Sequence, residues 1–305
     1  MASFPYNKRE RHTSPRLLFM GIFLVLSLLL VACGSNSTDT GSGGTTPTTN
    51  KPTITAPTDL ITAGTLTVGS DTTYPPQEYQ DPASGKYTGF DVDLITEMAN
   101  RMGLKTNVVK ANFDTILDDL TAKRYDVVIS AITINPERQK KADFVPYFQA
   151  GESLLVKKGN PKNIKSISDL CGLTVGVQNG TVEQTDLVNQ NKQCGSKLIS
   201  LTVLKDQTEV INLLANGRVD ATYQDSPVTD LYIKQHSDSF DVGGSVVNAA
   251  AEGIAVRKGD TSMLTAMQQA FKAVKDDGTY DKLFKTWTLS DGEKISFIDR
   301  RQNLA

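Results

Sequence analysis

The sequence is poor in the residues that most often build metal centres and catalytic triads. Its 305 residues include two histidines, three cysteines and one tryptophan. His12 lies in the N-terminal segment, and His236 stands alone in the rest of the chain. Zinc sites and serine or cysteine triads depend on histidine, and no stretch has the glycine-rich, lysine-containing pattern that binds phosphates. We therefore expect no metal, no cofactor and no triad.

The chain also lacks an excess of charge of one sign and a long apolar run. Lysine and arginine number 32 against 34 acidic residues, a net charge of −2, so we expect no nucleic-acid partner. The apolar run LLFMGIFLVLSLLLVA, at 17–32, is shorter than the about 20 residues of a membrane span. It follows basic residues at 8, 9, 11 and 16. This pattern predicts a secretory signal peptide over 1–32, with a single-pass anchor as the alternative.

A short motif ends the apolar run. Residues 30–34, LVACG, resemble the lipobox of bacterial lipoproteins, which implies that Cys33 is lipidated and anchored by its acyl chains. Residues 33–59 consist mostly of Gly, Ser, Thr, Pro and Asn, a composition that predicts a disordered tether. We therefore expect a domain held at the cell membrane by lipid, on its extracytoplasmic side.

Without Cys33, two cysteines remain, Cys171 and Cys194. In an exported chain such a pair indicates a disulfide. Its closure would stabilise the fold by up to about 3 kcal/mol in the chain-entropy view. The alternative is two free buried thiols.

The tetrapeptide Leu-Thr-Val-Gly occurs twice, at 66–69 and 173–176. Each copy reads as a short strand followed by a turn and a helix. We expect Asp91 to cap the first helix, Gly103 to end it and Thr181 to cap the second. The apolar side of the first helix consists of Val92, Leu94, Ile95, Met98 and Met102.

The two halves also match further along the chain. LTAKRYDV at 120–127 resembles LANGRVDA at 214–221, each at the end of a helix and before a strand. Strands that alternate with helices indicate parallel sheets with right-handed crossovers. The repeat therefore predicts an α/β chain with two similar lobes.

Small polar residues follow four of the predicted strands, at 70–74, 130–133, 178–181 and 224–226. Ligands of open α/β sheets bind outside the carboxyl ends of the strands. One such segment is an ordinary turn, but four together favour a binding site.

The chain resembles the solute-binding proteins of ABC-type polar amino-acid importers over about 62–288. The resemblance is carried by LTVGSDTTYPP, TGFDVDL, YDVVISAITINPER, GVQNGT, GRVDATYQD and EGIAVRKGD, in this order. It implies a two-lobed periplasmic-binding-protein fold, each lobe a mostly parallel sheet flanked by helices, with two hinge crossings. The first lobe would comprise 60–150 and 252–290, the second 153–245, followed by a C-terminal tail at 291–305.

The resemblance also implies a site for a zwitterion. Arg138 matches the family's carboxylate-binding arginine, whose guanidinium makes two parallel bonds, and Asp225 matches the ammonium-binding aspartate. Tyr74 and Phe113 match the aromatic walls. The remaining positions implied to bind through backbone or polar groups are Ser130, Ala131 (through its N–H), Thr133, Gln178, Gly180 and Thr181.

Specificity rests on fewer positions. Asp71 matches the residue that reads the far end of basic ligands and of glutamine, and Glu183 is a second carboxylate, or a solvated residue of the first helical turn. Gln77 stands where the family has an aromatic residue, which weakens the aromatic walls. No other basic residue falls at a site position, so an acidic ligand side chain would be buried unpaired. We expect arginine, lysine, ornithine, histidine or glutamine.

The resemblance implies a monomer that is not an enzyme and that delivers a free amino acid to an ABC permease and its ATPase. Two alternatives stay open. One is a periplasmic enzyme similar to cyclohexadienyl dehydratase, with Glu183 or Asp71 as general acid. The other is a ligand donor to a membrane sensor.

Overall fold

The strands of the computed structural model, which describes residues 54–295, form a large and a small sheet. They are β1 (Thr65–Ser70), β2 (Thr73–Tyr74), β3 (Glu78–Gln80), β4 (Tyr87–Thr88), β5 (Lys105–Lys110), β6 (Val127–Val128), β7 (Ala142–Lys157), β8 (Thr174–Gln178), β9 (Ser200–Leu204), β10 (Ala221–Asp225), β11 (Phe240–Val242) and β12 (Val247–Arg257). The large sheet has the order β5-β1-β6-β12-β7-β10-β8-β9, with β11 on β7. The small sheet is β2-β3-β4. Both predicted Leu-Thr-Val-Gly strands are present, as β1 and β8.

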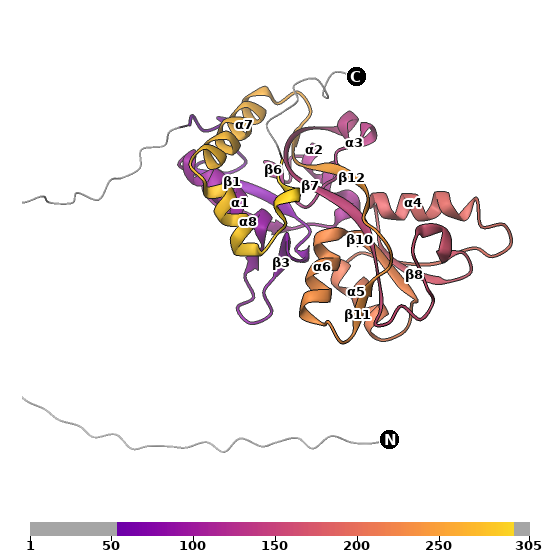
Figure 1. Cartoon of the computed structure of the whole chain (residues 1–305). Coiled ribbons are helices and arrows are strands. Elements are labelled where there is room, and N and C mark those ends of the chain that lie inside the picture. Colours follow the sequence, from indigo (N-terminus) through magenta and orange to yellow (C-terminus); the bar gives the residue numbers. More distant parts are fainter. Residues whose placement is uncertain (1–53, 296–305) are drawn as a thin grey trace, which may run out of the picture. The chain divides into compact units, whose positions relative to one another are not determined.

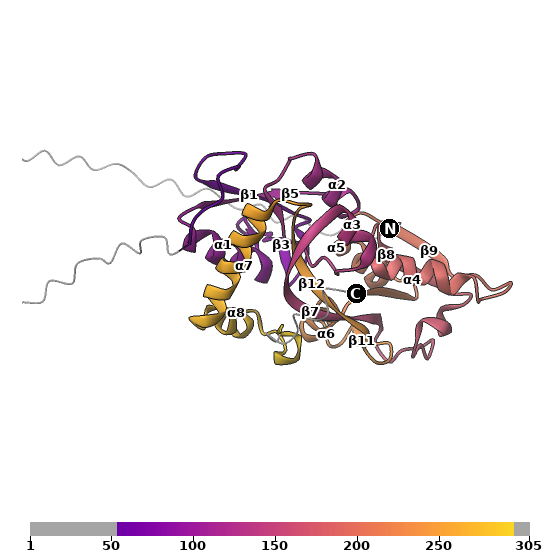
Figure 2. The same cartoon turned by 90° about the horizontal axis from the view of Figure 1, so that it is seen from above.

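The helices flank the two ends of the large sheet. They are α1 (Phe90–Arg101), α2 (Ile116–Thr121), α3 (Pro136–Lys141), α4 (Val182–Asn191), α5 (Gln207–Ala215), α6 (Ser226–Gln235), α7 (Thr261–Asp276) and α8 (Thr279–Trp287), with short 3₁₀ turns η1 (Phe113–Thr115), η2 (Ile167–Leu170) and η3 (Asp291–Glu293). Figures 1 and 2 show α1, α7 and α8 grouped beside β1, and α4, α5 and α6 beside β8 and β10.

The large sheet divides into two parallel parts joined by antiparallel strands. β5, β1 and β6 run parallel to one another, and so do β10, β8 and β9. Between them lie β7 and β12, which pair antiparallel with each other and reach both parts. We call the part around β1 the first lobe and the part around β8 the second lobe. The predicted two-lobed α/β fold with two crossings is confirmed.

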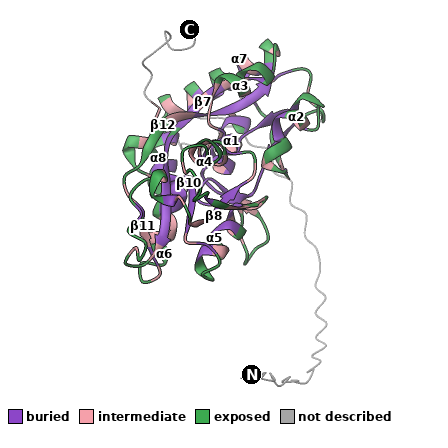
Figure 3. Cartoon of the chain, turned by 90° about the vertical axis from the view of Figure 1, so that its right-hand side faces the viewer, coloured by how far each residue is buried: buried purple, intermediate pink, exposed green. Residues whose placement is uncertain are grey.

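Each lobe buries its own apolar cluster. Figure 3 shows buried strands in both parts of the large sheet. In the first lobe, the apolar side predicted for α1 is buried at every position, from Val92 to Met102. A further cluster joins Tyr74 and Ala131 of the first lobe to apolar residues of the second, among them Ile211 and Val228. The lobes are therefore in direct contact.

The start of α1 differs from the prediction. Gly89, not Asp91, is the N-cap, and the helix begins at Phe90. A side chain at position 89 would collide with the Gln77 carbonyl, and the φ of 132° there favours glycine. Asp91 instead accepts hydrogen bonds from the Ala131 N–H and the Tyr147 hydroxyl. Gly103 follows the end of α1 with φ 70°, and the Thr181 side chain accepts from the Gln184 N–H, as predicted.

The predicted tether is too long at its C-terminal end. The side chain of Ile54 is buried in the apolar cluster of the first lobe, which also contains residues of α1. The Ile54 N–H donates to the Arg101 carbonyl at the end of α1. The tail prediction changes as well, since Asp291–Glu293 form η3 and Lys294 pairs with Phe148. The predicted signal peptide at 1–32, Cys33, residues 34–53 of the predicted tether and residues 296–305 of the predicted tail lie outside the described residues. Over 54–295, no helix is both long and apolar enough to cross a membrane.

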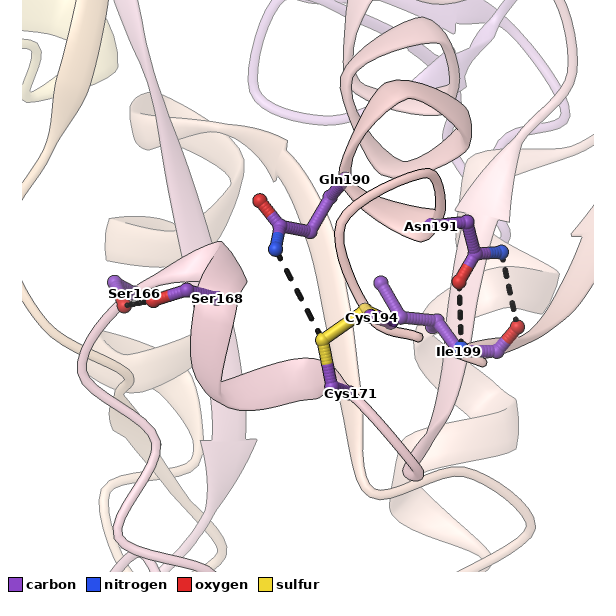
Figure 4. The surroundings of a disulfide bond; sticks show 7 residues. All are labelled: Ser166, Ser168, Cys171, Gln190, Asn191, Cys194 and Ile199. Carbon is purple, nitrogen blue, oxygen red and sulfur yellow. Dashed lines mark hydrogen bonds between the residues drawn. A yellow bond between two sulfur atoms is a disulfide. The ribbon is translucent and has the colours of Figure 1, made fainter. Parts of the chain in front are cut away.

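The predicted disulfide is confirmed: Cys171 and Cys194 are bonded, with 5.3 Å between their Cα atoms. The bond joins the end of η2 to the loop after α4 (Figure 4). Thr181 is the N-cap of the same helix. The Gln190 Nε2 of α4 lies 3.9 Å from the Cys171 Sγ. The Asn191 side chain makes two hydrogen bonds to the backbone of Ile199. The C-terminal end of α4 is thus held by several contacts.

Removing this bond is expected to lower the free energy of unfolding by up to about 3 kcal/mol, because it frees a loop of 23 residues in the unfolded chain. Denaturant unfolding of Cys171→Ser/Cys194→Ser in a Cys33→Ser background measures this, with Cys33→Ser alone as the control. Equal midpoints, together with two free thiols in the denatured and unreduced control, would contradict the assignment.

Candidate functional site

A small cavity lies where the two lobes meet. Its volume is about 10 Å³, about the space of one water molecule. Ten of the twelve predicted ligand-binding residues line it, and Val182 completes the lining. The residues are Tyr74, Phe113, Ser130, Ala131, Thr133, Arg138, Gln178, Thr181, Val182, Glu183 and Asp225. Among the described residues of this lining, Arg138 is the one basic side chain.

The cavity is built from the ends of strands in both lobes. Gln178 ends β8 and Asp225 ends β10, and these strands are parallel neighbours. Ser130 follows β6 and Tyr74 belongs to β2 in the first lobe. The carboxyl ends of parallel strands meet at one edge of a sheet, which brings Gln178, Asp225 and Ser130 to the boundary between the lobes. Tyr74 reaches the same boundary from the small antiparallel sheet.

Arg138 is positioned by the start of α3. The Asn135 side chain caps this helix by accepting from the Arg138 N–H at 2.9 Å. The guanidinium donates to the Thr133 carbonyl at 2.8 Å and, across the lobes, to the Gly180 carbonyl at 3.1 Å. Its Cζ lies 5.3 Å from the centre of the Phe113 ring, a cation–π distance. Two of its five N–H groups are thereby used, which leaves others for an anion.

Tyr74 and Asp225 meet directly across the lobes. The Tyr74 hydroxyl donates to Asp225 Oδ2 at 2.8 Å and accepts from the Asp225 N–H at 3.0 Å. Further bonds between the lobes join Gln178 to Asp71, Asn179 to Asp114, and the Gln207 N–H to Thr73. The two lobes are therefore held together by side chains at and around the cavity.

These side chains give a cavity with a cation and an anion brought from different lobes. The sequence of residues 66–290 matches the family described as bacterial extracellular solute-binding proteins, family 3.

This chain belongs to that family.

Individual proteins are similar to this chain along most of its length. The L-cystine-binding protein TcyJ of Escherichia coli K12 is 36% identical over 232 residues, covering 76% of this chain and 85% of TcyJ. An ancestral arginine-binding protein bound to arginine is 38% identical, with a TM-score of 0.69, over 73% of this chain and 98% of that one. An ancestral amino acid-binding protein, AncCDT-1, a precursor of cyclohexadienyl dehydratase, is 38% identical, with a TM-score of 0.66, over 73% and 95%.

Two predicted site residues of this family 3 chain lie outside the lining. Asp71 is buried, and its Oδ2 accepts from Gln178 Nε2 at 2.7 Å and from the Thr73 hydroxyl at 2.8 Å. Gly180 donates its N–H to Gln184 Oε1 and accepts from Arg138. A Cβ at position 180 would lie 2.8 Å from the Asp114 Cα. Gly180 thus permits the close approach of the lobes.

Ala131 lines the cavity, but its N–H is not left for a ligand as expected. It donates to Asp91 Oδ2 and to the Tyr147 hydroxyl, at 3.1 and 3.2 Å. Asp91 is free to accept this hydrogen bond because Gly89, and not Asp91, is the N-cap of α1. Ser130 is similarly engaged, since its hydroxyl donates to Glu78 Oε1 and accepts from the Asp71 N–H.

Carboxyl groups crowd the cavity. Burial raises the pKa of Asp225 to about 6, although Tyr74 and Arg138 oppose the shift. Burial and the neighbouring Asp225 raise the pKa of Glu183 well above its usual value. Burial lowers the pKa of Arg138, against the attraction of Glu183 and Asp225, and an arginine remains charged in proteins. At neutral pH Asp225 is therefore mostly ionised and can pair with a cation, whereas Glu183 holds its proton more tightly than a free glutamate does.

Sequence reasoning missed three residues here. Val182 lines the cavity, and it directly follows the predicted cap Thr181. Glu78 and Glu252 are buried beside the site, with oxygens that have no hydrogen-bond partner. Glu78 stands between Gln77 and Tyr79, and Glu252 between Ala251 and Gly253, so neither local sequence indicates a buried carboxyl group. Gln77 is also buried, but it does not line the cavity, so its amide does not alter the aromatic walls.

Proposed function

We propose that this protein captures a free polar amino acid outside the membrane and delivers it to the permease and ATPase of an ABC importer. The observation that carries the proposal is the pair formed by Arg138 of the first lobe and Asp225 of the second, both lining one cavity. A guanidinium suits an α-carboxylate, and a carboxylate suits an α-ammonium.

The cavity of about 10 Å³ is too small for an amino acid, so we propose that capture requires the lobes to separate and close again. A ligand that touches both lobes favours the closed state. We assign 60–150 and 252–290 to the first lobe and 153–245 to the second. Glu183 and the absence of a second basic side chain from the lining favour arginine, lysine, ornithine, histidine or glutamine as ligand.

A thermal-shift screen tests the capture of an amino acid. The panel consists of the twenty amino acids, ornithine, citrulline and cystine, the last because of the similarity to TcyJ. We expect a concentration-dependent rise in melting temperature for at least one basic or amide amino acid, because a ligand that binds only the folded state stabilises it. No shift with any member of the panel would contradict the proposal.

We also propose that the chain has no enzymatic activity and acts as a monomer. The similar proteins are named as binding proteins, although AncCDT-1 is a precursor of a dehydratase. Asp225 has no evident partner in a ring carboxylate without an ammonium group. Turnover of prephenate or arogenate by the purified protein would contradict this. A neighbouring gene for a sensor, in place of a permease and ATPase, would favour the role of a ligand donor.

Binding is expected to weaken in acid. The pKa of Asp225 is raised to about 6, so the ligand-free carboxyl binds a proton below that pH. An ammonium needs the anion, and the ligand must then displace the proton. The dissociation constant should rise by about tenfold per pH unit below pH 6, and it should be flat from pH 7 to 8. Calorimetry from pH 4.5 to 8 measures it; a constant affinity throughout would contradict the role of Asp225.

We propose that Cys33 carries a lipid anchor after removal of residues 1–32, which places the domain on the extracytoplasmic face of the membrane. Cys33→Ser should release the domain from the membrane fraction or block its maturation. The measurement is fractionation followed by mass determination, with the unchanged chain as control. Membrane attachment and processing that do not differ from the control would contradict the anchor.

A further inference from the structure

Asparagine followed by glycine occurs twice in the chain, at 179–180 and 216–217. In such a dipeptide the backbone nitrogen of the glycine can attack the side-chain carbonyl carbon of the asparagine, because glycine has no side chain to hinder the approach. The amide is then replaced by an acid, which is why asparagine counts among the thermally labile residues. The surroundings of each dipeptide determine how readily it converts and what the conversion changes.

Asn179 lies where the second lobe meets the first. It follows β8, and its Nδ2 donates to Asp114 Oδ2 of the first lobe at 2.9 Å. Asn179 is half-buried, and Asp114 and Gly180 are exposed, so water reaches this contact. Gly180 has φ 82°, and its N–H donates to the side-chain oxygen of Gln184. A side chain can rotate away, which leaves the Gly180 nitrogen free to attack.

Asn216 has a different setting. It is exposed, and it is the C-cap of α5 in the second lobe. The Gly217 N–H donates to the Leu214 carbonyl at 2.9 Å, so the end of the helix holds the attacking nitrogen in a backbone hydrogen bond. Asn216 also lies outside the lining of the cavity. It should convert more slowly than Asn179, and it serves as a control within the same chain.

We propose that Asn179 is a deamidation site and that its product weakens the closed arrangement of the lobes. The Gly180 nitrogen forms a bond to Asn179 Cγ and loses its proton, the Cγ–Nδ2 bond breaks, and Nδ2 leaves with that proton as ammonia. Water then opens the resulting ring at either of its two carbonyls and gives aspartate or isoaspartate. The net reaction consumes water and releases ammonia, with no oxidation or reduction.

Either product meets Asp114 differently from the parent amide. A carboxylate at 179 cannot donate to Asp114, so a hydrogen bond between the lobes is lost and two negative charges face each other. Isoaspartate also adds an atom to the backbone, at a place where a Cβ on Gly180 would already lie 2.8 Å from the Asp114 Cα. Both products disfavour closure, isoaspartate more strongly. This consequence rests on the proposed capture of an amino acid by closure of the lobes.

Peptide mapping by mass spectrometry tests the conversion itself. The purified protein is kept at pH 8 without any amino acid and sampled over time. We expect aspartate and isoaspartate to accumulate at 179 faster than at 216. No conversion at 179, or faster conversion at 216, would overturn the inference. Because this measurement needs no ligand, its result does not depend on the proposed function.

The variant Asn179→Asp tests the consequence. Calorimetry with the panel member that raises the melting temperature most should give an affinity roughly 5- to 30-fold weaker than the parent's. The double variant Asn179→Asp/Asp114→Asn exchanges donor and acceptor, so it should bind within threefold of the parent. The control Asn216→Asp should bind like the parent.

Two results would overturn the inference while the proposed function stands. One is an Asn179→Asp affinity within twofold of the parent's, and the other is a double variant that binds no better than Asn179→Asp. A parent that binds no member of the panel contradicts the proposed function instead, and the peptide mapping then decides whether Asn179 is a deamidation site.

Discussion

Replacing Arg138 by alanine is expected to weaken amino-acid binding by roughly 30-fold to several thousandfold. Removing one partner of a buried, hydrogen-bonded charge pair costs about 2–5 kcal/mol, and about 1.4 kcal/mol corresponds to a factor of ten. The α-carboxylate would be left in a cavity whose other charged side chains are acids. Calorimetry with the ligand found in the thermal-shift screen measures the loss.

Two further variants test whether the loss of affinity comes from the guanidinium of Arg138. Arg138→Lys keeps the charge but loses the planar fork, so its affinity should fall between those of the parent and Arg138→Ala. Arg218→Ala removes an exposed arginine outside the cavity and should bind like the parent. Without ligand, Arg138→Ala should melt close to the parent, because Arg138 lies outside the apolar clusters. Binding within threefold of the parent would remove the carboxylate assignment.

Replacing Asp225 by asparagine is expected to weaken binding by at least about 30-fold at pH 7.5, for the same reason applied to the α-ammonium. The substitution keeps the size of the side chain and an oxygen that accepts from Tyr74, so the charge alone is tested. Without ligand, the melting temperature should stay equal or rise, because a buried carboxylate has been removed.

The same variant tests the pH dependence. The parent should lose affinity below pH 6, where Asp225 binds a proton, whereas Asp225→Asn should change much less over this range. Glu183, whose pKa is also raised, accounts for any remaining slope. An affinity of Asp225→Asn that matches the parent at pH 7.5 and falls equally in acid would exclude Asp225 as the ammonium partner.

The fold could be predicted from local patterns because they repeat. The tetrapeptide at 66–69 and 173–176 marks β1 and β8, and the small polar residues after the strands mark the edge where the cavity lies. The apolar spacing from Val92 to Met102 placed the buried face of α1 correctly, but its first residue was wrong. That start depends on the approach of Gly89 to Gln77, a tertiary contact that spacing does not encode.

The site, like the fold, could be predicted in part from the sequence. Family motifs named ten residues that share the cavity, yet no motif indicates that Gln178 holds Asp71 or that Asp91 occupies the Ala131 N–H. These contacts join residues 107 and 40 positions apart in the chain. They depend on how strand ends meet across the sheet and across the lobes. Sequence patterns therefore predicted which residues gather at the site better than they predicted which hydrogen bonds each one makes.

We propose that both charges of a free amino acid are bound between the lobes. Calorimetry of the parent at pH 7.5 tests it with three forms of the best ligand: the free amino acid, its α-N-acetyl derivative and its α-methyl ester. We predict one ligand bound per chain for the free amino acid, and an affinity at least about 30-fold weaker for each derivative, since each removes one of the two charges. Binding of either derivative within threefold of the free amino acid would contradict the account.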